Sequence, residues 1–116
     1  MTKPTAEELQ TKTNQELNEL VAVAQGWYKD QEQFYSVEQW YSSERIRVVS
    51  VKHYQPTEPT EQGESQCWKL MVKCKMTITY LDVGAEVLVY GICKFYDKDP
   101  QRAAVIAAIL YLQEQE

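Results

Sequence analysis

Apolar side chains recur every three to four residues between positions 17 and 24, which is the period of one helix face. This stripe consists of Leu17, Leu20, Val21 and Ala24. Thr13 lies three residues before Glu16, a spacing at which the two side chains satisfy the first free amides of a helix. Gly26 follows at a position where helices commonly end. The pattern predicts a helix between Thr13 and Gly26, after a flexible polar N-terminus over residues 1–12. Thr5 and Glu8 repeat the capping spacing, so a helix start one or two turns earlier is the alternative.

The longest regular pattern is a strict alternation over residues 68–80. Every even position there is apolar or aromatic, and the odd positions carry mainly lysine and threonine. This alternation is typical of a strand with one buried and one exposed face. Two more strands are predicted over residues 46–54, which are rich in β-branched side chains, and over residues 85–96. The turn at residues 82–84 is too short for a crossover connection, so the sheet should be antiparallel.

Two segments between these elements are less regular. Residues 27–43 hold six aromatic side chains among polar ones, and helical spacings between Phe34 and Tyr41 predict a second short helix there. Residues 55–66 contain two prolines, one glycine and three glutamates but no aliphatic side chain. We expect this second segment to be a solvated, mobile loop.

The chain ends in a second long helix. Asp99 can accept hydrogen bonds from its free amides, and Pro100 suits the first helical position. From Ala103 to Leu112 the helix is apolar on nearly all sides, so it should be buried on more than one side, with another subunit as one candidate for the second surface. The predicted fold is α+β: an N-terminal helix, a three-stranded antiparallel sheet and a C-terminal alanine-rich helix packed on the sheet, in one domain over residues 13–116.

Composition narrows the range of functions. The 116 residues suit one domain, and 12 basic against 17 acidic residues give a net charge of -5, which argues against a strongly cationic nucleic-acid binder. One histidine and three cysteines without a C-x-x-C pair fit neither a metal site nor a disulfide framework. The four glycines form no phosphate-binding loop. We therefore expect a protein without enzymatic activity, metal or cofactor.

The terminal and apolar segments bear on the compartment. The N-terminus is polar and acidic, unlike a signal peptide, and the longest apolar run, residues 103–109, is too short to cross a bilayer. We expect a cytoplasmic protein with reduced thiols and no membrane partner.

Basic residues gather in two segments of this acidic chain. Residues 44–56 and residues 68–84 each carry a net charge of +2. A basic sheet face of this kind can meet phosphate or an acidic partner. The alternative is that lysines on an exposed strand only prevent aggregation. The basic candidates for a binding site are Arg45, Arg47, Lys69, Lys73 and Lys75.

The aromatic segment supplies the other candidates. They are Trp27, Tyr28, Tyr35, Trp40 and Tyr41. Aromatic rings close to arginines can stack on nucleotide bases, at about 1–3 kcal/mol per base. Protein interfaces select the same residue types, and tryptophans also fill cores. Whether this segment is core, interface or pocket stays open at this stage.

Two stretches resemble a known family. Residues 17–27 (LNELVAVAQGW) resemble the opening helix of the phage ABA-sandwich family, and residues 100–109 (PQRAAVIAAI) resemble its closing helix. Residues 67–70 (CWKL) correspond to a Trp-containing segment that tends to be helical in that family, whereas the alternation favours a strand; both interpretations of residues 68–75 stay open. The resemblance implies a small, oligomeric accessory protein of a phage or prophage, in the host cytoplasm, and brings no catalytic residues.

A second likeness is to single-strand annealing proteins and double-stranded RNA-binding domains, which also place a hairpin before an alanine-rich helix. The Lys-Lys pair expected at the helix start of the RNA-binding domains is missing, since residues 99–102 are DPQR. We expect a homo-oligomer that binds a host or phage macromolecule, a protein in the first place, or a nucleotide. The alternatives are a nucleic-acid-binding module of the annealing type and a sponge for signalling nucleotides.

Overall fold

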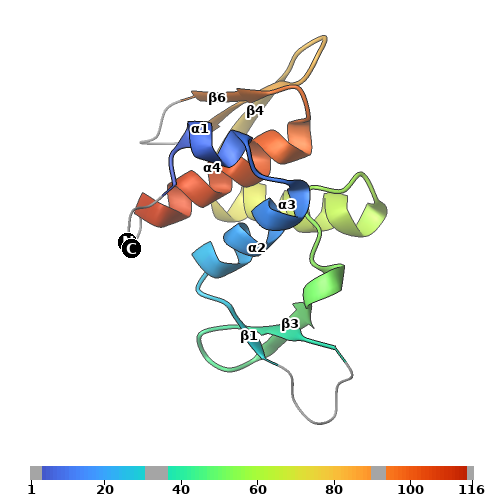
Figure 1. Ribbon diagram of the computed structural model, residues 1–116. Coiled ribbons are helices and arrows are strands. Elements are labelled where there is room, and N and C mark those ends of the chain that lie inside the picture. Colours follow the sequence, from blue (N-terminus) through green and yellow to red (C-terminus); the bar gives the residue numbers. More distant parts are fainter. Residues whose placement is uncertain (1–3, 31–36, 90–93, 115–116) are drawn as a thin grey trace.

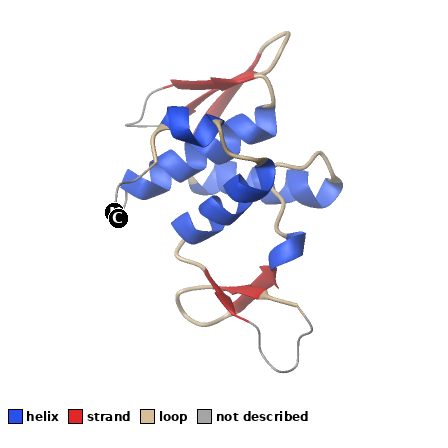
Figure 2. Ribbon diagram, in the orientation of Figure 1, coloured by secondary structure: helices blue, strands red, loops and turns tan. Residues whose placement is uncertain are grey.

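Two small antiparallel sheets lie at opposite ends of a group of helices (Figures 1 and 2). The computed structural model describes residues 4–30, 37–89 and 94–114. The helices are α1 (Ala6–Gln10), α2 (Asn14–Ala24), α3 (Glu61–Lys73) and α4 (Pro100–Glu114), with a 3₁₀ turn η1 (Val51–His53). Sheet A contains β1 (Tyr28–Asp30), β2 (Gln39–Tyr41) and β3 (Arg47–Ser50). Sheet B contains β4 (Met76–Tyr80), β5 (Ala85–Val89) and β6 (Lys94–Asp97).

The C-terminal helix packs on sheet B, which confirms the predicted α+β fold. Residues 103–109 of α4 are all buried, and so are Val87 and Phe95, which pair across β5 and β6. The predicted helix start is also confirmed, because Asp99 Oδ1 accepts the backbone N–H of Gln101 at 3.1 Å. The small alanine side chains let the sheet approach the α4 backbone closely.

The other sides of α4 are covered within the same chain, by α1, α2 and α3, so a second subunit is not needed to bury this helix. Helix α2 forms where predicted, with the capping box of Thr13 and Glu16 in place and Gly26 at a φ of +86°. Residues 4–12 differ from the flexible segment that was expected there, and residues 1–3 lie outside the described part of the chain. A second capping box at Thr5 begins α1, whose Leu9 is fully buried.

The main correction concerns residues 55–73. Helix α3 occupies the second half of the expected mobile loop and the first half of the expected long strand. Thr60 Oγ1 accepts the Gly63 N–H at 3.0 Å and begins the helix. The prediction of a strand over residues 68–80 is wrong for 68–73 and right for 76–80. The Trp-containing segment at 67–70 is helical, as the family resemblance implies.

Sheet A was not expected. Residues 39–41 form a buried strand where a short helix was predicted; residues 31–36 lie outside the described part of the chain. The strand predicted over 46–54 ends at Ser50 and continues as η1. The strand predicted over 85–96 is two antiparallel strands, since Ala85 pairs with Asp97 and Val87 with Phe95. Residues 90–93, between them, are also outside the described part.

Candidate functional site

An open cleft of about 790 Å³ lies between sheet A and α3, and we call it the Trp27 cleft. Trp27 and Tyr54 meet edge to face, with ring centroids 4.9 Å apart, and β3 adds Val48 and Val49. Polar side chains of α3 form the facing wall. The α3 residues that line the cleft are Glu61, Gln62, Ser65, Gln66, Lys69, Leu70 and Lys73. The cleft therefore has aromatic and aliphatic surface on one side and two ammonium groups on the other.

A chain of hydrogen bonds joins α2, the cleft floor and α3. The Gln25 Nε2 amide donates to Tyr54 Oη at 2.8 Å, and Lys73 Nζ donates to Gln25 Oε1 at 3.3 Å. Burial raises the pKa of the Tyr54 phenol above its ordinary value, so the hydroxyl stays neutral well into the alkaline range. Tyr54 is thus a fixed neutral wall of the cleft, and its position depends on Gln25.

Helix α3 presents three distinct faces. The face towards α4 is buried and carries Cys67 and Leu70, with Cys74 as the buried C-cap, and a second face exposes Trp68 and Val72. Lys69 and Lys73 lie one turn apart on the cleft face. Within the described part of the chain Lys69 has no ion-pair partner, whereas Lys73 is bonded to Gln25. The predicted basic sheet face is therefore replaced by a helix face with two lysines.

The remaining aromatic candidates separate into different environments. Trp40 and Tyr41 lie in β2, the central strand of sheet A, and are buried, at 1% and 4% exposed. Tyr28 is 40% exposed and stacks on Tyr41, with ring centroids 5.7 Å apart. Tyr35 lies outside the described residues. In the aromatic segment, Trp40 and Tyr41 are therefore core residues, and Trp27 is the residue that lines the cleft.

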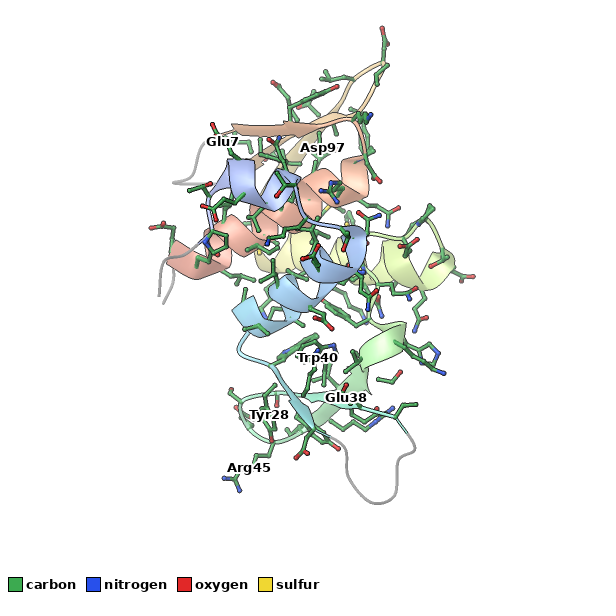
Figure 3. The ribbon with its side chains drawn as sticks, in the orientation of Figure 1. Glu7, Tyr28, Glu38, Trp40, Arg45 and Asp97 are labelled. Carbon is green, nitrogen blue, oxygen red and sulfur yellow. The ribbon has the colours of Figure 1, made fainter. Side chains whose placement is uncertain are left out.

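The other basic candidates lie apart from the cleft. Arg45 is exposed in the turn between β2 and β3, at a φ of 66°, and in Figure 3 it points away from the body near Tyr28. Arg47 Nε donates to Gln39 Oε1 at 2.8 Å. Lys75 lies between α3 and β4 at a φ of 54°. The five basic candidates thus share no single surface.

A second cleft of about 610 Å³ lies between α2, β2 and η1. Glu19, Glu38, Glu58 and Lys52 are among its lining residues, and Trp40 and Glu38 are seen on that side of sheet A in Figure 3. Its charged groups are mostly acidic, and the part of the chain that the structure describes holds no cluster of three or more residues suited to a metal ion.

None of the described helices is long and apolar enough to span a membrane.

Sequence reasoning found three residues of the Trp27 cleft, namely Trp27, Lys69 and Lys73, but not its glutamines, Tyr54 or Val48 and Val49. A helical spacing did exist for the glutamine and lysine face, because residues 62, 66, 69 and 73 recur at intervals of three and four. The stronger period of two over residues 68–80 obscured it.

The two described cysteines give a testable consequence of the α3–α4 packing. Burial raises the pKa of both the Cys67 and Cys74 thiols to about 11. At pH 8 about one molecule in a thousand would carry either thiolate, against about a quarter for an ordinary thiol. We expect iodoacetamide to label both at least about a hundredfold more slowly in the folded than in the urea-denatured protein, by peptide mass spectrometry. Equal rates would contradict the packing of α3.

The Trp27 cleft combines features that suit a planar, anionic ligand. Aromatic and aliphatic surface can hold a ring, amide side chains can fix its edge, and two lysines can neutralise acidic groups. Its volume falls within the range of small-molecule sites, about 300–1,000 Å³. Comparison of the chain with protein families, with curated proteins and with solved structures gives no match.

Proposed function

We propose that the protein is a non-enzymatic accessory protein, of phage or prophage origin, that binds a nucleotide in the Trp27 cleft. The observation that carries the proposal is that Trp27, Lys69 and Lys73 line one open cleft. The base would lie against Trp27 and Val48, and phosphates would lie at the two lysines. The resemblance of residues 17–27, in and after α2, and of residues 100–109, in α4, to the phage ABA-sandwich family supports the accessory role.

A nucleotide explains the cleft better than a long nucleic acid does. A single-stranded nucleic acid needs a basic groove that follows its backbone over several nucleotides. Arg45 lies at the far end of sheet A and Lys75 beyond α3, so neither extends the two cleft lysines into such a groove. Glu61, at the start of α3, would repel acidic groups of a ligand. The phosphates are therefore expected at the end of the cleft near Lys69 and Lys73.

A thermal-shift panel tests this function. The panel contains mononucleotides, dinucleotides and cyclic dinucleotides. The cyclic dinucleotides are included because a signalling nucleotide is the most specific ligand class that the proposal names. A ligand at one hundred times its Kd should stabilise the protein by about 2.7 kcal/mol and raise the Tm by several degrees. Replacing Lys69→Glu and Lys73→Glu together should abolish that shift, because the cleft then repels phosphate.

The matched control is Lys52→Glu with Lys98→Glu, which changes the net charge equally at two exposed residues outside the cleft. It should keep the full ligand shift. No shift with any nucleotide, or equal shifts in both double variants, would contradict the proposal. Binding of single-stranded DNA or RNA with a steep salt dependence would favour the annealing-type module instead.

A further inference from the structure

A groove separate from the Trp27 cleft runs between α3 and the edge of sheet B. It has a volume of about 340 Å³, with Trp68 and Met71 on the helix side and Ile78 and Tyr80 on the strand side. Trp68 is 62% exposed and Tyr80 is 69% exposed. We call it the β4 groove. Large rings at this exposure add apolar surface that a partner can bury.

The strand beside this groove is an unprotected sheet edge. In sheet B the order is β4-β5-β6, so β4 pairs with β5 on one side and, among the described residues, with no strand on the other. Its sequence, MTITY, has no charge and no proline. The opposite edge, β6, carries Asp97, and the edges of sheet A carry Lys29, Asp30 and Arg47. Charged residues are the usual protection of a free edge, and β4 lacks them.

The exposed face of α3 is acidic near its start and is followed by a basic residue after its end, so two antiparallel copies of it would place opposite charges together. Along this face come Glu64, Trp68 and Val72, and Lys75 follows just after the helix. These positions are separated by four, four and three residues. If a second copy of the helix runs in the opposite direction, an acid meets a base at each end and Trp68 meets the partner's Val72 in the middle.

From these three observations we infer that the β4 groove is the interface of a two-fold homodimer. The β4 strands of the two copies pair antiparallel, as a two-fold axis requires, and join the two B sheets into one six-stranded sheet. The two α3 helices then lie against each other beneath this junction. Glu64 approaches the partner's Lys75, and the apolar groove is closed. A second copy is favoured over a foreign strand because the charges of one α3 complement those of the other.

This interface is independent of the ligand proposed above, since Lys69 and Lys73 lie on a different face of α3. Its test is the oligomeric state of the full chain, measured by sedimentation velocity and light scattering between about 1 and 100 µM, a range that covers micromolar dissociation constants. We expect a dimer that dissociates at least tenfold more readily after Trp68→Glu or Val72→Glu. Both side chains are exposed, so the monomer fold should persist by circular dichroism.

The control is Ile46→Glu, because Ile46 is 60% exposed but lies between β2 and β3 at the other end of the molecule. This variant should remain dimeric. A monomeric wild type at 100 µM, as expected if a foreign strand covers β4, would overturn the inference. So would a dimer that Trp68→Glu and Val72→Glu leave intact, or one that Ile46→Glu weakens equally.

Exchanging the charges tests the antiparallel arrangement itself. Glu64→Lys and Lys75→Glu should each weaken the dimer, by a few-fold, because each places like charges together at both ends of the helix pair. The two changes in one chain restore opposite charges and should recover the wild-type dissociation constant. A double variant weaker than both single variants, or single variants without effect, would exclude this pairing.

Discussion

Replacing Arg102 with alanine is expected to lower the free energy of unfolding by about 2–4 kcal/mol, by analogy with other charged hydrogen bonds that lose one partner. Arg102 lies in the first turn of α4, and its side chain is 16% exposed. One guanidinium nitrogen donates to Asn14 Oδ1 at 2.8 Å. Another donates to two backbone carbonyls, that of Gln10 at 2.8 Å and that of Lys12 at 2.6 Å.

These contacts hold the link between α1 and α2 on α4. Residues 11–13 make a tight turn, and the Gln10 and Lys12 carbonyls on either side of Thr11 both accept from the guanidinium. Asp97 at the end of β6 lies 3.7 Å from Arg102 Nε, so sheet B is joined to the same point. Arg102→Ala leaves these acceptors without their donor, which is the main source of the loss.

Urea denaturation followed by circular dichroism measures the effect. Lys98→Ala is the control, because Lys98 is exposed and close by, and it should change the stability by less than about 0.5 kcal/mol. Arg102→Lys should recover only part of the loss, since an ammonium group cannot reproduce the fork of the guanidinium. If Arg102→Ala behaves like the control, the α1–α2 link is not held in this way.

Replacing Gly63 with alanine is expected to destabilise the protein by about 1–3 kcal/mol, although alanine is the better helix former. A Cβ at Gly63 would come within 2.6 Å of the Gln55 carbonyl oxygen and closer still to that of Glu58. Both oxygens belong to the backbone, so the segment over 55–58 would have to move. The gain of about 1 kcal/mol in helix propensity is smaller than the cost of this overlap.

Ser65→Ala is the matched control for this second variant. Ser65 is exposed two residues further along α3, so alanine there should be neutral or slightly stabilising. The changes in Tm and in the free energy of unfolding, measured by thermal and urea denaturation, should therefore have opposite signs in the two variants or differ clearly in size. A Gly63→Ala variant as stable as Ser65→Ala would mean that α3 does not pack on residues 55–58.

The elements that could be predicted are those in which local and tertiary preferences agree. Helix α2 has both its capping residues and one apolar stripe, and α4 begins at Asp99 and Pro100. In β4 four of five residues are β-branched or aromatic, and its pairing with β5 follows from the short turn over 81–84. In each case the signal lies within a few residues of the element.

The failure at α3 has a definite cause. The even positions from 68 to 74 are all apolar, but Leu70 and Cys74 are buried whereas Trp68 and Val72 are 62% and 59% exposed. The apolar residues at even positions therefore come from two helix faces, one buried and one exposed. Together they give the same alternation in the sequence as a strand with one apolar face. The composition of residues 61–73 favoured a helix, since Val72 is their single β-branched residue.

The sequence by itself determined the α+β class, the helices α2 and α4, the β4–β5 hairpin and three residues of the Trp27 cleft. Their signals are local, being caps, turns and one-face periodicities that each element carries alone. The tertiary structure alone decided that α3 is a helix, that β1, β2 and β3 form a separate sheet, and that Trp27 and Tyr54 face Lys69 and Lys73. These depend on contacts between different elements, from strand pairs such as Tyr28 with Tyr41 to the hydrogen bond between Gln25 and Lys73. In each case burial selects among local conformations of similar free energy.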